Sequence, residues 1–174
     1  MQLSKNGFME IVSHEAMVQT RYKDSKGVWT IGIGHTKSAG APNPQTFSGE
    51  MPLDTVISLF RKDLEKYEAR VNKYITVELE QHEFDALVSF DFNTGGVSTA
   101  TLVKKLNAGD KAAAAKGFMN WVKPAEIKKR RKKEQILFST GKYSGGGKGS
   151  VIKANSAGKV LWSTSKSVDL KEFF

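Results

Sequence analysis

The stretch that decides the fold is Thr20-Arg21-Tyr22-Lys23-Asp24-Ser25-Lys26-Gly27-Val28-Trp29-Thr30-Ile31-Gly32-Ile33-Gly34. Aromatic and β-branched residues flank the turn-forming segment at 24–27, which is the pattern of a β-hairpin. Upstream of it, Phe8, Ile11 and Val12 recur at the spacing of one helix face, and Ser4 is the expected N-cap. The sequence therefore predicts a helix over residues 4–15, followed by a hairpin.

Most of the remaining chain has helical periodicity. The predicted helices cover residues 53–75, 80–92, 98–106, 110–121 and 126–139, and residues 37–51 are expected to form a loop. Residues 143–157 are rich in Gly, Ser and Lys and are interpreted as a mobile loop. Residues 159–169 alternate apolar and polar side chains, which predicts one or two short strands. The fold class is thus α+β and mainly helical, and residues 1–174 are expected to form one domain.

Composition excludes several kinds of chemistry and favours an anionic partner. The chain has no cysteine, which excludes disulfides, thiolate zinc sites and a cysteine nucleophile. Its three histidines have no convincing metal-ligand spacing, and no metal or cofactor is expected. A net charge of +9 is compatible with nucleic acid, an anionic membrane face or the bacterial wall. No nucleic-acid-binding motif is present, so nucleic acid is not the predicted partner, although the charge keeps DNA binding as a rival to be tested.

Two carboxylic acids and a hydroxyl are candidates for catalysis. Glu15 continues the apolar stripe of the first predicted helix, where exclusion of water favours the protonated form of a carboxyl group. Asp24 lies at the hairpin turn, in a more solvated place, and Thr30 supplies a hydroxyl six residues further on. Two carboxyls in opposed environments are the acid and base of a glycosidase. Each residue also has an ordinary interpretation, as a helix-end acid, a turn residue and a strand residue.

The combination of these residues resembles the phage-type, T4-like lysozymes. The resemblance rests on His14-Glu15, on residues 22–36, on Phe84-Asp85-Ala86-Leu87-Val88-Ser89-Phe90, on Phe92-Asn93-Thr94-Gly95 and on Arg130-Arg131 with Glu134. It covers about residues 5–141, the implied catalytic core, and leaves an extension at 142–174 of unknown purpose. It departs from the family at Ala16, where a Gly commonly follows the catalytic Glu.

The resemblance implies a lysozyme-like fold, with a small N-terminal hairpin lobe, a larger helical lobe and a cleft between them. It implies a muramidase that hydrolyses the β-1,4 bond between N-acetylmuramic acid and N-acetylglucosamine in peptidoglycan. Glu15 would protonate the glycosidic oxygen, and Asp24 with Thr30 would hold the attacking water. A lytic transglycosylase and a non-hydrolytic peptidoglycan-binding domain are the alternatives, and retention of Glu15 and Asp24 argues against the latter.

Two further residues are candidates for substrate binding. In the family, an arginine near the position of Arg130 forms an ion pair with the catalytic Glu, whereas a purely structural arginine cluster with Glu134 is the alternative. Asn93 is placed in the cleft by the resemblance, and it is equally well explained as a helix cap.

Expectations about partners and location complete the prediction. Lys128, Lys129, Lys132 and Lys133 should face outward from the last helix and contact anionic wall or lipopolysaccharide. The N-terminus has no apolar leader and no run reaches the roughly 18 apolar residues of a membrane helix. We therefore expect a monomer that accumulates in the host cytoplasm and reaches the wall after holin-type release, as a phage or prophage endolysin does. A bacterial antagonism effector is the alternative biological role.

Overall fold

The computed structural model describes residues 1–174, and the chain divides into two compact units. The first unit consists of Met1–Glu10 and Leu64–Gly146, and the second consists of Ile11–Asp63 and Gly147–Phe174. Each unit is therefore assembled from two segments that are far apart in the sequence. The C-terminal residues from Gly147 onward belong to the second unit, together with the predicted hairpin.

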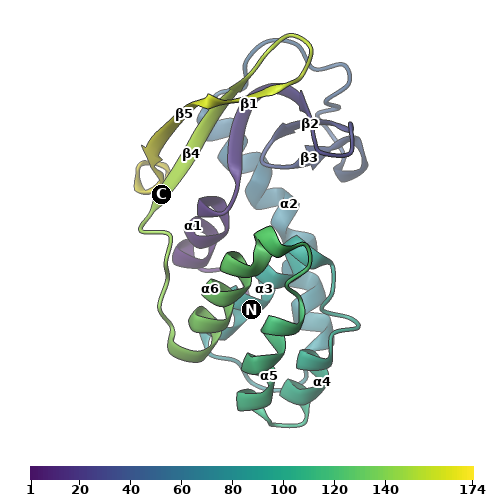
Figure 1. Ribbon diagram of the computed structural model, residues 1–174, viewed down its shortest axis with the longest axis vertical. Helices are drawn as coiled ribbons and strands as arrows, with labels where there is room; N and C mark the ends of the chain where they lie inside the picture. The colour runs from purple at the N-terminus through teal and green to yellow at the C-terminus, as the bar shows by residue number, and fades with distance from the viewer. The chain divides into compact units, whose positions relative to one another are not determined.

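The second unit contains a five-stranded sheet. Its strands are β1 (Ala16–Lys23), β2 (Trp29–Gly32), β3 (His35–Thr36), β4 (Lys148–Ala154) and β5 (Val160–Asp169), in the order β3-β2-β1-β4-β5 (Figure 1). β1 and β2 are antiparallel, with Lys23 opposite Trp29, which confirms the hairpin and its turn at 24–27. β4 runs parallel to β1, and β5 runs antiparallel to β4.

The predicted loop over residues 143–157 is wrong for half of its length, because β4 occupies Lys148–Ala154. Gly149 shows why a small residue is needed within this strand. A Cβ atom at Gly149 would lie 2.8 Å from the side-chain ends of both Leu170 and Met17, so a larger residue would force these two side chains to shift. The expected hairpin lobe is accordingly a larger sheet, to which the C-terminus contributes two strands.

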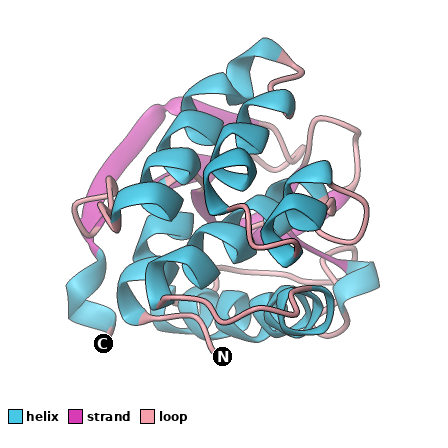
Figure 2. Cartoon of the chain, turned by 90° about the horizontal axis from the view of Figure 1, so that it is seen from below, coloured by secondary structure: helices cyan, strands magenta, loops and turns pink.

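The helices follow the sequence pattern closely. They are α1 (Lys5–Ser13), α2 (Leu53–Tyr74), α3 (Gln81–Thr94), α4 (Thr101–Asn107), α5 (Lys111–Gly117) and α6 (Lys128–Thr140). Helices account for more of the chain than strands do (Figure 2). α1 ends two residues before the predicted end, and the segment predicted at 110–121 finishes in a 3₁₀ turn, Phe118–Asn120. No helix is both long and apolar enough to cross a membrane.

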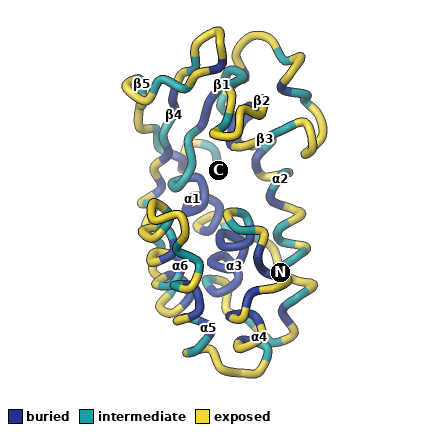
Figure 3. The backbone as a smooth tube through the Cα atoms, turned by 45° about the vertical axis from the view of Figure 1, so that its right-hand side comes forward, coloured by how far each residue is buried: buried dark blue, intermediate teal, exposed yellow.

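Helix α3 is the central buried element of the first unit (Figure 3). Every residue from Glu83 to Asp91 is buried, including Phe84 and Phe90, which are fully buried. A capping box between Glu80 and Glu83 starts the helix, and Gly95 ends it in the left-handed conformation. The prediction of a buried helix is confirmed, although the helix extends two residues beyond Phe92.

Two buried carboxylates hold the N-terminal segment of the first unit, and the first of them, Asp85, accepts a hydrogen bond from the Ser4 N–H at 3.1 Å. The Ser4 hydroxyl accepts a hydrogen bond from the Gly7 N–H at 2.9 Å, which confirms the predicted N-cap. Glu10, only 2% exposed, accepts hydrogen bonds from the backbone N–H groups of Ser144 and Gly145, at 2.6 and 2.7 Å. Because these bonds fix the chain between α6 and β4, the expectation of a mobile loop is wrong at this point.

Candidate active site

Glu15 occupies a bend between two anchored elements. The last turn of α1 is closed by hydrogen bonds from the His14 N–H to the Ile11 carbonyl, 3.1 Å, and from the Glu15 N–H to the Val12 carbonyl, 3.0 Å. Directly after Glu15, Ala16 begins β1 and pairs with Ser150 of β4. The Glu15 side chain is half-buried, so it lies just beyond the fully buried stripe of Ile11 and Val12. The prediction that helix α1 itself carries Glu15 is therefore wrong by two residues.

Asp24 directly follows β1 and organises the turn after the strand. Its Oδ1 atom accepts hydrogen bonds from the N–H groups of Lys26, at 2.8 Å, and Val28, at 2.9 Å. Gly27 has a φ of 77°, which glycine adopts without strain, and its N–H donates to the Asp24 carbonyl. These bonds hold the carboxylate in one orientation, and the Oδ2 atom accepts no hydrogen bond from the protein.

A single pocket in the second unit brings the two predicted carboxylates together. It has a volume of about 800 Å³, and its lining includes Glu15, Tyr22, Asp24 and Trp162. Each acid reaches the pocket from a different end of β1, because Glu15 precedes the strand and Asp24 follows it. A pocket with two carboxyl groups and aromatic walls is a suitable place for acid–base chemistry on a sugar chain.

Thr30 contacts the backbone of the turn, and its predicted part in holding the attacking water stays a prediction. It is 1% exposed, does not line the pocket, and donates its hydroxyl hydrogen bond to the Val28 carbonyl at 3.0 Å. Val28 in turn donates its N–H to Asp24 and accepts the Asp24 N–H. Thr30 is thus linked to Asp24 through the backbone of Val28, and it supports the turn that positions the carboxylate.

Tyr22 is a pocket residue that the sequence reasoning did not identify as functional. Burial raises the pKa of its phenol to about 12, and the negative charges of Glu15 and Asp24 act in the same direction, while a backbone hydrogen bond at Gly34 opposes them. The phenol therefore stays protonated at neutral pH and is available as a hydrogen-bond donor. Its position two residues before Asp24 on the predicted hairpin was the only signal in the sequence.

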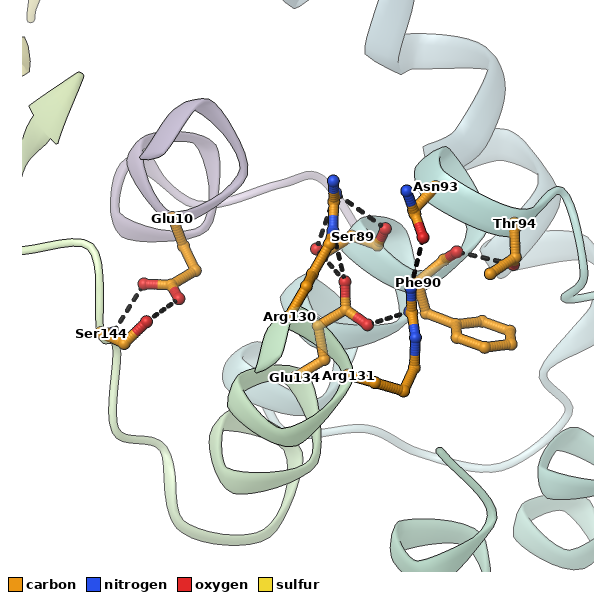
Figure 4. Close-up of polar contacts among 9 residues, drawn as sticks. All are labelled: Glu10, Ser89, Phe90, Asn93, Thr94, Arg130, Arg131, Glu134 and Ser144. Atoms are coloured by element: carbon orange, nitrogen blue, oxygen red, sulfur yellow. Dashed lines mark hydrogen bonds and ion pairs between the residues drawn. The ribbon is translucent and has the colours of Figure 1, made fainter. Parts of the chain in front are cut away.

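Arg130 and Glu134 form a polar network with Ser89 in the first unit (Figure 4). The Arg130 Nε donates to Glu134 at 3.0 Å, and the Ser89 hydroxyl donates to the same Glu134 oxygen at 2.7 Å. Arg131 is fully buried and also pairs with Glu134. The predicted inward-facing arginines with Glu134 as their partner are confirmed, and the predicted ion pair between Arg130 and Glu15 stays a prediction.

Asn93 lies in the last turn of α3 and is exposed. Its side-chain oxygen accepts a hydrogen bond from Arg131 (Figure 4). The interpretation of Asn93 as the helix cap is wrong, because Gly95 ends the helix instead. Its role in sugar binding stays a prediction.

His35 has the structural role that the sequence analysis favoured. Its side chain is buried, and Nδ1 lies 2.8 Å from Asp63 Oδ2 while Nε2 lies 3.1 Å from the Pro42 carbonyl. These contacts tie the loop after β3 to the middle of α2.

Residues 12–134 match the family model described as phage lysozyme. The chain belongs to the phage lysozyme family. An endolysin of Acyrthosiphon pisum secondary endosymbiont phage 1 is 33% identical over 152 residues, covering 80% of this chain and 99% of the relative. As a member of the phage lysozyme family, the chain is a glycosidase of the lysozyme type, in agreement with the resemblance seen in its sequence.

Solved structures of the phage lysozyme fold agree with this membership. A crystal structure of a mutant lysozyme from phage P22 is similar with a TM-score of 0.72 and 29% identity, covering 80% of this chain and 99% of that one. The muramidase domain of SpmX from Asticaccaulis excentricus has a TM-score of 0.70 and 30% identity, with 80% and 98% of the two chains covered. The predicted lysozyme-like α+β fold is confirmed.

Proposed function

We propose that this lysozyme is an endolysin-type muramidase that hydrolyses the β-1,4 bond between N-acetylmuramic acid and N-acetylglucosamine in peptidoglycan. The observation that carries the proposal is the shared pocket of Glu15 and Asp24, built on the two ends of β1. The family membership and the similar endolysin support the same activity and the same substrate.

In the proposed reaction Glu15 is the general acid. It gives its proton to the glycosidic oxygen as the bond to the anomeric carbon breaks, so that the departing sugar leaves as an alcohol. Asp24 accepts a proton from a water molecule, whose oxygen forms the new bond on the opposite face of the sugar ring and inverts the anomeric configuration. Thr30 contributes by holding the Val28 backbone that orients Asp24.

Two alternative activities of the same pocket would be recognised by their products. In a lytic transglycosylase, the muramic acid C6 hydroxyl attacks in place of water, and the product is an anhydro sugar. A peptidoglycan-binding domain releases no fragments at all. Both acids are present and face one pocket, which favours the hydrolase over a binding domain.

Substrate contacts and wall association extend the proposal beyond the two acids. We assign Asn93 and Arg130 to glycan binding, with Arg130 as the ionic partner of Glu15. Lys128, Lys129, Lys132 and Lys133 are all exposed on α6, and this basic face is proposed to contact anionic wall or lipopolysaccharide. The enzyme is proposed to work as a monomer at the wall after a holin-type lesion releases it from the cytoplasm.

Digestion of purified peptidoglycan, followed by mass spectrometry of the released fragments, tests the proposed reaction. Fragments with a reducing-end N-acetylmuramic acid are expected from the wild type, and Glu15→Gln is expected to release none while its circular dichroism spectrum and melting temperature are retained. Glu65→Gln, on the exposed face of α2, is the matched control and should cleave normally. Anhydro-muramic products would replace the hydrolase with a transglycosylase, and full activity of Glu15→Gln would remove Glu15 as the acid.

A further inference from the structure

The C-terminal hairpin of β4 and β5 forms one wall of the pocket that holds Glu15 and Asp24. Ala157, Gly158, Lys159, Val160 and Trp162 all line this pocket. These residues lie outside the segment at 12–134 that matches the phage lysozyme model. The wall therefore lies outside the segment that matches the family model.

This wall is fixed to the catalytic side of the pocket by direct contacts. The Gly158 carbonyl accepts a hydrogen bond from the Lys23 N–H at 2.8 Å, next to Asp24 in the chain. Gly158 also lies against the ring of Trp29, because a Cβ atom there would be 2.7 Å from Trp29 Cζ3. Together with the pairing of β4 on β1, these contacts give the hairpin a defined position relative to Glu15 and Asp24.

Trp162 differs from the other two tryptophans of the chain. The Trp29 ring lies under the Arg21 guanidinium at 4.7 Å, and the Trp121 ring packs edge-on against Phe90 at 5.3 Å. Trp162 has no aromatic or cation–π contact of this kind, and it is 69% exposed although it lines the pocket. Val160 precedes it by two residues in β5 and lines the same pocket.

We propose that Trp162 is a glycan-binding residue, on which a sugar ring of the peptidoglycan strand stacks, and that the C-terminal hairpin thereby adds a subsite to the pocket. The proposal rests on the proposed function, since it takes the glycan strand as the substrate. An aromatic ring provides a large, rigid apolar surface that matches the C–H face of a pyranose, and it loses little conformational freedom on binding. Tryptophan offers the largest such surface, and here its exposed face borders the pocket of the two acids.

Binding to an uncleaved strand tests the subsite directly. Soluble glycan strands freed of their peptides are titrated by calorimetry into Glu15→Gln protein, so that no cleavage intervenes. When Trp162→Ala is combined with Glu15→Gln, we expect the affinity for the strands to be roughly five- to tenfold weaker than that of Glu15→Gln alone, whereas Trp162→Phe in the same background should retain most of the affinity. Ile136→Ala is the matched control, because it removes an exposed apolar side chain of α6 and should leave binding unchanged. Equal affinity of Trp162→Ala and its parent would overturn the inference.

A second measurement leaves Trp162 itself intact. N-bromosuccinimide oxidises accessible indole rings, and mass spectrometry locates the modified residue. In Glu15→Gln protein, the strands are expected to protect Trp162 from oxidation, with half-protection near the calorimetric Kd. Oxidation of Trp162 at an unchanged rate under saturating glycan would also overturn the inference, whatever the stability of the alanine variant.

The kinetic readout separates this inference from the proposed reaction. In the otherwise wild-type enzyme, Trp162→Ala is expected to raise KM several-fold with little change in kcat, because Trp162 binds the strand without touching the reacting bond. A wild type that cleaves nothing would refute the proposed reaction, and the binding and protection results would still decide the role of Trp162. A wild type that cleaves with an unchanged KM in Trp162→Ala would refute the subsite alone.

Discussion

Thr30 illustrates how a single residue acts through the backbone. Its hydroxyl contacts the Val28 carbonyl, and the Val28 N–H contacts the Asp24 carboxylate, so one buried residue orients an acid that it does not touch. The spacing of Glu15, Asp24 and Thr30 was visible in the sequence, but the route from Thr30 to Asp24 was not. It depends on the turn geometry at 24–28, which only the folded hairpin defines.

Removal of the Thr30 hydroxyl tests this positioning role. Thr30→Val keeps the volume of the side chain and loses the hydrogen bond to Val28, so we expect a loss of about 1 kcal/mol of stability and a fall in kcat of roughly tenfold. Thr30→Ser keeps the hydroxyl and should restore kcat. Chemical denaturation and initial rates of peptidoglycan digestion measure the two effects, and a fully active Thr30→Val enzyme would show that the hydroxyl has no role.

Tyr22 makes a prediction about alkaline pH. Its pKa of about 12 in the folded protein lies above the ordinary value of 10. As the pH rises from 10 to 12 the unfolded state loses this proton before the folded state does, so folding stability falls with rising pH over that range and is unaffected below it. Between pH 9 and pH 12 the Tyr22 phenol is expected to lower the free energy of unfolding by on the order of 2 kcal/mol, and Tyr22→Phe should remove this decrease.

Urea denaturation at several pH values measures this difference. Burial also raises the pKa of Tyr143 to about 12, so part of the alkaline loss should remain in Tyr22→Phe. Identical pH dependence in the wild type and in Tyr22→Phe would contradict the environment assigned to the Tyr22 phenol.

At the scale of elements, strand β4 is a case in which the local sequence does not predict the secondary structure. Residues 143–157 have the composition of a loop, yet Lys148–Ala154 is a strand that pairs with both β1 and β5. Pairing with a strand about 130 residues earlier is a tertiary effect, and strand formation depends more on such partners than on intrinsic preference. The helices, by contrast, were predicted well, because their apolar periodicity is local.

The turn between β4 and β5 supplies a prediction for the hairpin as an element. Gly158→Ala should destabilise the protein by about 2 kcal/mol or more, because alanine is strained at a φ of 84° and its methyl group would collide with Trp29. Gly49→Ala is the matched control, since Gly49 has the same φ of 84° and open space around its Cα. The difference between the two variants in thermal unfolding isolates the contact with Trp29, and equal destabilisation would argue against a tight contact.

At the scale of the whole molecule, the net charge of +9 is expected to govern association with the wall. We expect the rate of whole-cell lysis at low ionic strength to fall several-fold when four lysines of α6 are replaced by Gln, namely Lys128, Lys129, Lys132 and Lys133. The difference should vanish near 1 M salt, where the screening length is about 3 Å. The replacement of Lys62, Lys66, Lys104 and Lys105 by Gln also removes four charges and is the control for net charge alone.

Turbidity measurements on outer-membrane-permeabilised cells, across a range of salt concentrations, compare the two variants. A larger effect of the α6 variant supports a local wall-binding face. Equal effects of both variants would assign the attraction to net charge and refute a role for the basic helix.

By itself, the sequence determined the helices and the first hairpin, because each is encoded in periodicity or spacing over a few neighbouring residues, whereas the pair of acids was predicted from the family resemblance. The tertiary structure alone decided that β4 and β5 complete the sheet, that the Thr30 hydroxyl donates to the Val28 carbonyl, and that Tyr22 and Trp162 share a pocket with Glu15 and Asp24. These features join segments more than a hundred residues apart or depend on backbone geometry at a turn. No local pattern of residues specifies such contacts, because their free energy comes from packing and pairing that exist only in the folded chain.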